Sequence, residues 1–361
     1  MLVGCCGFGS SGSSVVTDYL KEYNSFDVID DFEYTLCYCP DGIRALDFGL
    51  NEFPSRNDFA SVSLDRFSNL VLKKIPNSAF IKQSKIDKKS FLKISKKYIE
   101  SLITLEWKGY NGTEFITCSP FYRKIGIGFL MQRFIPFYEK NKKLIWKKKY
   151  PYHRICLCSH PSDFILKTKQ YNSSIINLAS SNNSEIKVLD QPFPGDDPLS
   201  CMKYFDDPKC IIVDRDPRDT YIFIKTKLKH RGSFMPSDSV CDFVEYYKKI
   251  RNNYEKIKSK KNVLFIKFED MVYKYDETTK KVTDFLGIGA NPNPKTIFIP
   301  ERSMANTQLF KRFKEFESDI KYIEKELSAY LYDFTDCKYL AKGDMFFGRS
   351  NINLLKNEKQ K

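Results

Sequence analysis

The first residues that could do chemistry form a glycine- and serine-rich stretch at positions 7–14, which lies between an apolar run and a helix-like pattern. Backbone N–H groups at the start of a helix have no partner inside it, and the helix dipole favours an anion there. Glycines let the backbone approach a ligand, and serine hydroxyls add hydrogen-bond donors. We therefore predict a phosphate-binding loop, called the phosphate loop below. Its anion-binding residues are expected to be Gly9, Ser10, Ser11, Gly12, Ser13 and Ser14.

The glycine spacing of this loop fits more than one kind of nucleotide enzyme. Gly7, Gly9 and Gly12 match a dinucleotide fingerprint, and an acid at position 30 or 31 lies where a ribose-binding carboxylate is expected. The same stretch has the spacing of a Walker loop, but Ser13 stands at the lysine position, where an NTPase needs a cation for the outer phosphates. The loop alone does not choose among a nicotinamide oxidoreductase, a degenerate kinase and other enzymes of phosphorylated nucleotides.

A second candidate site lies at positions 214–219, directly after the apolar run Ile211-Ile212-Val213. Pro217 suits the first turn of a helix and Asp216 is a natural N-cap. Arg215 is then left at the carboxyl end of a strand, where open parallel sheets bind ligands. A guanidinium group matches phosphate with paired hydrogen bonds. An ion-paired helix start would explain Arg218, but it does not explain why Arg215 directly follows the strand.

Apolar runs that alternate with helical patterns must position these two sites. Alternating strands and helices imply an α/β fold with three layers, in which a largely parallel sheet has helices on both faces. We expect one helical face to continue through positions 269–286. The predicted strands are residues 1–6, Phe26 to Ile29, Ile155 to Cys158, Ile186 to Leu189, Cys210 to Asp214 and Val263 to Lys267.

The remaining stretches predict how the domain is organised. We expect a single domain over residues 1–361, in which residues 32–150 are a mainly helical insertion that binds the acceptor. Within it, the basic and aromatic run at 142–150 is either a solvated helix face or a site for an anionic acceptor. Residues 351–361 are expected to be a frayed tail.

Composition narrows the partners and the compartment. The chain of 361 residues carries a formal net charge of +14, which favours acidic partners such as nucleotides, glycans or an anionic membrane surface. The basic residues are dispersed and form no recognised nucleic-acid motif, so we expect no nucleic-acid partner. The 11 cysteines form no C-x-x-C pair, which favours reduced thiols in the cytoplasm and no metal site. No secretory signal and no run of about 18 apolar residues is present, so no membrane span is expected.

Three motifs in this order resemble the sulfotransferases that use 3′-phosphoadenosine 5′-phosphosulfate (PAPS), which have a P-loop-like fold. The motifs are Ser11-Gly12-Ser13-Ser14, Arg215-Asp216-Pro217-Arg218-Asp219, and Phe265-Ile266-Lys267-Phe268-Glu269-Asp270-Met271 followed by Phe285-Leu286-Gly287. The segment from Asp190-Gln191-Pro192 to Asp214 is similar to bacterial members, which points to a carbohydrate sulfotransferase.

The resemblance implies a set of roles. The phosphate loop would hold the 5′-phosphosulfate of PAPS, Arg215 the 3′-phosphate, and Arg302 would belong to a basic loop that closes the site. In-line transfer to a hydroxyl, expected on a polysaccharide or another carbohydrate, would leave 3′,5′-diphosphoadenosine and needs no metal. A carboxylate shortly after the second strand would accept the hydroxyl proton, with Glu33 the first candidate and Asp31 the second.

Two positions depart from the family pattern. Ser10 stands where the family usually has a Lys or Arg that contacts the sulfuryl group, and Phe223 stands where a serine usually binds the 3′-phosphate. The cations that could substitute are Lys82, Arg302, Lys311 and Arg312. The alternatives left open are an NAD(P)-dependent oxidoreductase and a non-catalytic protein that binds a nucleotide or a glycan.

Overall fold

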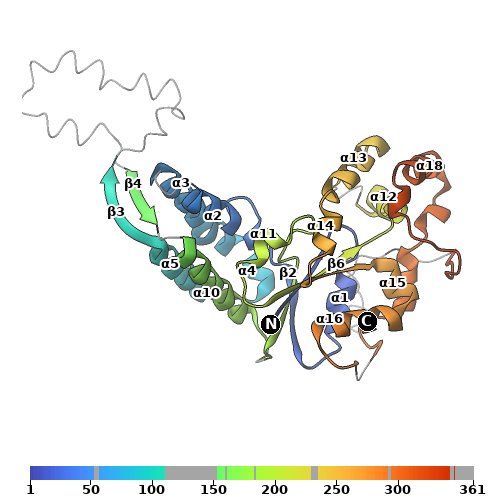
Figure 1. The fold of residues 1–361 in the computed structure, drawn as a ribbon, viewed down its shortest axis with the longest axis horizontal. Helices are drawn as coiled ribbons and strands as arrows, with labels where there is room; N and C mark the ends of the chain where they lie inside the picture. Colours follow the sequence, from blue (N-terminus) through green and yellow to red (C-terminus); the bar gives the residue numbers. More distant parts are fainter. Residues whose placement is uncertain are drawn as a thin grey trace, which may run out of the picture. The chain divides into compact units, whose positions relative to one another are not determined.

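A computed structural model of the chain describes residues 1–52, 57–109, 153–158, 161–182, 184–228, 235–291, 294–341 and 345 (Figure 1). The chain divides into two compact units. Unit 1 comprises Met1–Tyr38, Lys82–Ile86 and Ile175–Lys361, and unit 2 comprises Cys39–Ile81 and Asp87–Ser174. The predicted single domain with an insertion at 32–150 stays a prediction. The basic run at 142–150 and the tail at 351–361 lie outside the described residues.

Unit 1 is built on a five-stranded sheet in the order β2-β5-β1-β6-β7, in which every pair of neighbours is parallel. This confirms the predicted α/β fold with a largely parallel sheet. Because β1 lies in the centre, the loop that follows it opens between the carboxyl ends of β5 and β6. The strands are β1 (Leu2–Gly7), β2 (Phe26–Glu33), β5 (Ile186–Asp190), β6 (Pro208–Asp214) and β7 (Val263–Lys267).

Helices surround this sheet, and α1, α15 and α16 pack together against one of its faces (Figure 1). The predicted helical face at 269–286 is present, but α15 and α16 are separate helices that break at Lys274. The helices of unit 1 are α1 (Ser14–Leu20), α11 (Leu199–Met202), α12 (Pro217–Lys227), α13 (Val240–Ile250), α14 (Tyr254–Lys258), α15 (Phe268–Tyr273), α16 (Tyr275–Leu286), α17 (Pro300–Ser303) and α18 (Glu317–Glu326), with short 3-10 helices at Thr35–Cys37, Met304–Asn306, Leu309–Lys311, Lys314–Phe316 and Ser328–Tyr330.

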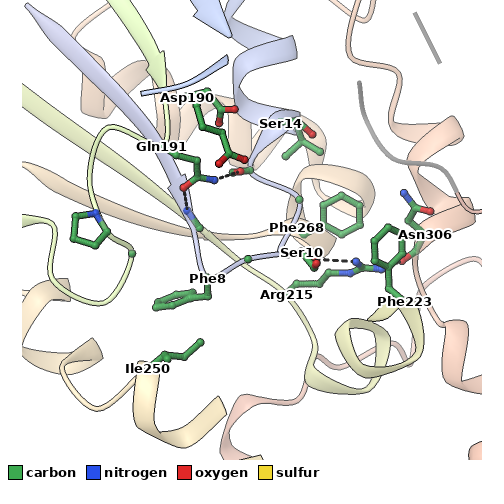
Figure 2. Close-up of a pocket in the computed structure, with 18 of the residues that line it drawn as sticks. Phe8, Ser10, Ser14, Asp190, Gln191, Arg215, Phe223, Ile250, Phe268 and Asn306 are labelled. Carbon is green, nitrogen blue, oxygen red and sulfur yellow. Dashed lines mark hydrogen bonds between the residues drawn. The ribbon is translucent and has the colours of Figure 1, made fainter. Parts of the chain in front are cut away.

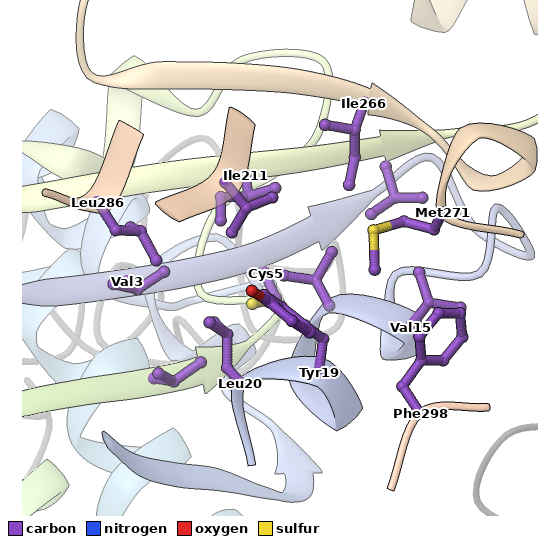
Figure 3. Packing of buried hydrophobic residues seen from close by; sticks show 14 of the residues in the cluster. Val3, Cys5, Val15, Tyr19, Leu20, Ile211, Ile266, Met271, Leu286 and Phe298 are labelled. Atoms are coloured by element: carbon purple, nitrogen blue, oxygen red, sulfur yellow. The ribbon is translucent and has the colours of Figure 1, made fainter. Parts of the chain in front are cut away.

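The central strand β1 is buried on both faces, which explains its uninterrupted apolar sequence. Val3 and Cys5 join the apolar cluster beneath α1, α15 and α16 (Figure 3). On the opposite face, a Cβ added to Gly4 would lie 2.5 Å from the ring of Phe193. Burial on two sides fixes the end of β1, and with it the start of the phosphate loop.

Unit 2 contains a separate pair of antiparallel strands, β3 (Ile103–Gly109) and β4 (His153–Cys158). The strand predicted at Ile155 to Cys158 exists, but its assignment to the parallel sheet was wrong. A short apolar run predicts a strand without specifying its partner. The helices of this unit are α2 (Ile43–Asn51), α3 (Asn57–Asn69), α5 (Lys88–Leu102) and a π-helical turn at Leu70–Lys74 that leads into a 3-10 turn at Ile75–Asn77, while α4 (Ala79–Ser84) and α10 (Pro161–Ala179) cross the unit boundary.

Within the described ranges, none of the helices combines the length and the apolar character needed to cross a membrane. The same residues contain no group of three or more His, Cys, Asp or Glu side chains that could hold a metal ion.

Candidate nucleotide-binding site

The phosphate loop adopts a conformation that depends on its glycines. Gly9 and Gly12 have φ values of +77° and +83°, in the left-handed region that L side chains rarely adopt. A Cβ on Gly12 would also lie 2.6 Å from the ring of Phe268. Ser10 has a left-handed φ of +52° as well, although it is not a glycine. The loop therefore holds a backbone shape that an ordinary sequence would not adopt.

This shape leaves backbone donors available for a ligand. At the start of α1, the N–H groups of Val15 and Val16 donate to the carbonyl groups of Gly12 and Ser13. The N–H groups of residues 9–13 have no protein acceptor in the described part of the chain. Unpaired amides beside a helix N-terminus favour an anion, and anion binding at this loop stays a prediction.

Ser11 differs from its neighbours in the loop because its side chain points into the protein and not into the cavity. Its side chain is buried, and its Oγ accepts a hydrogen bond from Phe8 N–H at 3.1 Å. A Cβ on Gly7 would lie 2.2 Å from this oxygen. The contacts of the Ser11 hydroxyl stabilise the loop internally, and Ser11 is not among the residues that line the cavity described below.

Arg215 lies immediately after β6, and its side chain reaches the phosphate loop (Figure 2). Its Nη1 donates to the carbonyl oxygen of Ser10 at 3.1 Å, and its Nη2 donates to that of Asn306. The guanidinium carbon lies 5.1 Å from the ring centre of Phe223 and 5.2 Å from that of Phe268. Phe223, at the position where the resemblance led us to expect a serine, thus covers one side of the arginine. Although Arg215 is only 3% exposed, its Nε has no hydrogen-bond partner among the described residues.

The start of α12 holds Arg215 in place as the sequence predicted. Pro217 is the first helical residue, and the side chain of Asp216 caps the helix by accepting from Arg218 N–H at 2.8 Å. The Arg218 side chain folds back onto Asp216, with 2.8 Å between Nη2 and Oδ2, and also pairs with Glu324 at 2.9 Å. Arg218 therefore has a structural role, and Arg215 is left to face a ligand.

Two further carboxylates tie distant segments to this helix start. Glu269, from the third sequence motif, accepts a hydrogen bond from Asp216 N–H at 2.9 Å through Oε1. Asp219 accepts from the N–H groups of Gln308 and Leu309 at 2.7 and 2.6 Å. These bonds position the segment that contributes Asn306 to the site. The three motifs recognised in the sequence thus meet around one arginine.

Burial makes these carboxylates hard to ionise. Burial, strengthened by the nearby charge of Asp216, raises the pKa of Glu269 to about 8, and the same two causes raise the pKa of Asp219 to about 7. The opposite holds for Asp214 on the same strand end: burial alone would raise its pKa, but Arg251 and Lys267 outweigh burial and hold the pKa below its usual value.

Replacing Glu269 with glutamine should make stability less dependent on pH. A carboxyl whose folded-state pKa is raised keeps its proton in the folded state at a pH where the unfolded chain has already lost it. The contribution of Glu269 to the free energy of unfolding is therefore complete below about pH 4 and is lost as the pH rises to about 8. We expect the unfolding free energy to fall with rising pH, by up to about 1 kcal/mol per pH unit from this carboxyl. Urea unfolding of both proteins between pH 5 and 8 measures it. Equal slopes would contradict this account.

The phosphate loop and Arg215 line one cavity of about 510 Å³, a size typical of ligand pockets. Of the residues predicted from the sequence, those that line it are Gly9, Ser10, Gly12, Ser13, Ser14, Glu33 and Arg215. Ser11, Asp31 and Arg302 do not. The cavity is also lined by residues that the prediction of the site did not include, among them Asp18, Tyr38, Asp190, Gln191, Asp196, Phe268, Phe298 and Asn306.

The two candidate bases have different positions. Glu33 is the last residue of β2, lies in register with Asp190 of β5 and lines the cavity. The Asp31 side chain is 61% exposed and lies 3.9 Å from Lys85 Nζ, outside the cavity lining. Of the two, only Glu33 can meet a ligand in this cavity.

The cavity-lining carboxylate and amide of Asp190 and Gln191 were missed as site residues, although the sequence contained a signal for them. They follow the predicted strand at Ile186 to Leu189, and carboxyl ends of parallel strands meet at one edge of a sheet. No comparable signal marked Tyr38, which was expected in an insertion.

Arg215 is the one cation among the residues that line the cavity in the described ranges. None of the four proposed substitutes for a lysine at position 10 lines it. Arg302 is exposed, the Lys311 side chain donates to Gln308 Oε1 at 2.6 Å, and Arg312 donates to the carbonyl of Ala305. Among the described residues, the loop therefore has no second cation in the cavity lining.

Part of the chain that forms this site matches a known protein family. Residues 197–333 match the family model described as the sulfotransferase domain, a span that contains Arg215, the α12 start and Glu269. This span of the chain is therefore similar to sulfotransferase domains, which indicates an enzyme of sulfuryl transfer. The family generally uses a PAPS-type sulfate donor. The phosphate loop precedes the matched span, and its hydrogen bond with Arg215 joins it to the family's domain.

Among solved structures, this chain is similar to the "Sulfotransferase Domain from the Synechococcus PCC 7002 Olefin Synthase". The match has a TM-score of 0.38 and 13% sequence identity, and it covers 83% of this chain and 75% of that chain. No curated protein is significantly similar in sequence.

Proposed function

We propose that this sulfotransferase transfers a sulfuryl group from PAPS to a hydroxyl group of a carbohydrate. One observation carries the proposal. The phosphate loop, with its unpaired amides, and the Arg215 guanidinium line the same cavity and are joined by the 3.1 Å hydrogen bond from Arg215 Nη1 to Ser10. Two anion-binding groups in one cavity suit a nucleotide that carries phosphate at both its 5′ and 3′ positions.

The cavity-lining residues provide hydrogen-bond donors for both phosphate groups of such a nucleotide. The amides of residues 9–13 and the hydroxyls of Ser13 and Ser14 would hold the 5′-phosphosulfate. Arg215 would hold the 3′-phosphate, because its buried Nε lacks a partner among the described residues and a guanidinium presents five donors. PAPS itself supplies a sulfuryl group that is activated by its bond to phosphate.

The proposed transfer is an in-line displacement. The acceptor oxygen forms a bond to sulfur while the bond from sulfur to the bridging phosphate oxygen breaks, and the electron pair leaves with 3′,5′-diphosphoadenosine. Glu33 accepts the hydroxyl proton. Amides of the phosphate loop stabilise the negative charge that builds on the leaving phosphate. In this scheme the loop amides alone stabilise the charge on the leaving phosphate, because Ser10 stands where a lysine would contribute to that stabilisation.

The carbohydrate acceptor is proposed from the polar groups that line the cavity together with Glu33. Tyr38, Asp190 and Asp196 line the same cavity and present a phenol and two carboxylates. Carboxylates accept hydrogen bonds from the hydroxyl groups of a sugar, and a phenol can both donate to them and accept from them. The lining offers no cation besides Arg215 in the described ranges, so a neutral sugar suits it better than a polyanionic glycan.

Replacing Glu33 with glutamine should lower kcat by roughly 10²- to 10⁴-fold, because the base that accepts the proton is lost. The affinity for 3′,5′-diphosphoadenosine should stay within a few-fold of wild type, since Glu33 is assigned to the acceptor and not to the nucleotide. Transfer of radiolabelled sulfate from PAPS to a panel of neutral oligosaccharides measures the rate, and calorimetry measures the affinity.

Asp31→Asn is the matched control, because Asp31 lies two residues away on the same strand but outside the cavity lining, and it should retain the wild-type rate. A Glu33→Gln enzyme of wild-type rate would contradict the assigned base. Nucleotide binding by the wild-type protein without sulfate transfer to any acceptor would instead favour a non-catalytic binding protein.

A further inference from the structure

The side chain of Gln191, the residue that follows β5, joins the two ends of the phosphate loop (Figure 2). Its Oε1 accepts a hydrogen bond from Gly7 N–H at 3.3 Å, and its Nε2 donates to Ser13 Oγ at 2.9 Å. One amide group therefore bridges the last residue of β1 and the N-cap residue of α1.

These two contacts determine the direction in which the Ser13 hydroxyl can donate. A backbone N–H can only donate, so the amide atom that faces Gly7 is the oxygen and the atom that faces Ser13 is the NH₂ group. The NH₂ group also can only donate, so Ser13 Oγ accepts and its own hydrogen remains available. No described residue accepts a hydrogen bond from the Ser13 hydroxyl, and Ser13 lines the cavity.

Gln191 is itself held by its backbone. Its N–H donates to the carbonyl of Cys5 in β1 at 2.9 Å, and its carbonyl accepts from the Tyr38 hydroxyl at 3.1 Å. Its φ of +53° is left-handed, a conformation that is costly for a residue other than glycine and persists where the surroundings enforce it. Gln191 is therefore anchored well enough to orient a neighbouring group.

We propose that Gln191 is a positioning residue that keeps the Ser13 hydroxyl oriented as a donor toward the 5′-phosphosulfate. The inference rests on the proposed function, because it requires an anion at the phosphate loop. Gln191 acts through Ser13 and does not itself contact the transferred group. A hydrogen bond from a hydroxyl to a charged oxygen is among the stronger ones in proteins, so the loss of its orientation should be measurable.

A double-mutant cycle tests this coupling, with calorimetric titration of 3′,5′-diphosphoadenosine as the readout. Ser13→Ala and Gln191→Ala should each weaken binding about 10-fold, and the double variant should be little weaker than either single one, because both remove the same donor. Independent effects that multiply to about 100-fold would overturn the inference. Gln170→Ala, an exposed glutamine in α10, is the control and should bind as wild type does.

Gln191→Glu gives a second measurement with the side-chain shape preserved. The carboxylate still accepts from Gly7 N–H but cannot donate to Ser13, whose hydroxyl would then donate to it instead of to the ligand. Binding should fall at least as far as in Gln191→Ala, and wild-type affinity in this variant would overturn the inference. If Gln191→Ala does not fold, Gln191→Gly, which suits the left-handed backbone, replaces it in the cycle.

The two proposals fail in different ways. A wild-type protein that does not bind 3′,5′-diphosphoadenosine overturns the proposed donor and this inference with it. Tight binding by the wild type and by every Gln191 variant overturns only the role of Gln191.

Discussion

Replacing Arg215 with alanine should weaken the binding of 3′,5′-diphosphoadenosine about 100-fold, which corresponds to about 2.7 kcal/mol. The guanidinium is the one cation among the cavity-lining residues in the described ranges, and its buried Nε has no partner there. Hydrogen bonds from a buried cation to a phosphate are each worth about 1.5 to 3 kcal/mol. Calorimetric titration at constant ionic strength measures the loss.

Adenosine 5′-monophosphate, which lacks the 3′-phosphate, separates this loss from a general disturbance of the site. Its affinity should change only a few-fold in Arg215→Ala, through the lost bond to the Ser10 carbonyl. Arg215→Lys should fall between wild type and alanine, because an ammonium group keeps the charge but not the planar fork or its stacking between Phe223 and Phe268. An equal loss of affinity for both nucleotides would count against a 3′-phosphate at Arg215.

Replacing Gly12 with alanine should abolish measurable nucleotide binding, a loss of at least 100-fold. The φ of +83° disfavours any side chain by about 1 to 2 kcal/mol, and the new Cβ would lie 2.6 Å from the ring of Phe268. That ring also packs against Arg215, so relief of the clash would disturb both anion-binding groups at once. Nucleotide titration and thermal unfolding measure the two consequences.

Gly287→Ala is the matched control for backbone strain without a clash. Gly287 also has a left-handed φ, of +74°, but no atom lies within 4 Å of an added Cβ. This variant should lose about 1 kcal/mol of stability and keep wild-type nucleotide affinity. If Gly12→Ala binds the nucleotide as Gly287→Ala does, then the loop geometry is not what creates the site.

The central strands of unit 1 could be predicted because they are buried on both faces, and their sequences are therefore nearly continuous apolar runs. The runs at Leu2–Gly7 and Pro208–Asp214 show this most clearly. The partner of β4 could not be predicted, since register and pairing depend on which surface meets the strand and not on the strand itself. The break between α15 and α16 was also missed, because the buried positions keep helical spacing on both sides of Lys274.

The candidate site was predictable at positions where the residue type strongly prefers one local backbone structure. Asp216 and Pro217 predict the start of a helix, and Gly9 and Gly12 predict a loop whose backbone has positive φ. The role of Gln191 could not be predicted, because it depends on two contacts with residues that lie about 180 positions away in the chain. Long-range contacts of a single polar side chain leave no periodic pattern in the sequence.

A crystal structure of the protein with 3′,5′-diphosphoadenosine tests the central claim most directly. We predict the 5′-phosphate on the amides of residues 9–13 and the 3′-phosphate on the guanidinium of Arg215, both within one cavity. A nucleotide bound in another place, or with its 3′-phosphate turned away from Arg215, would contradict the account.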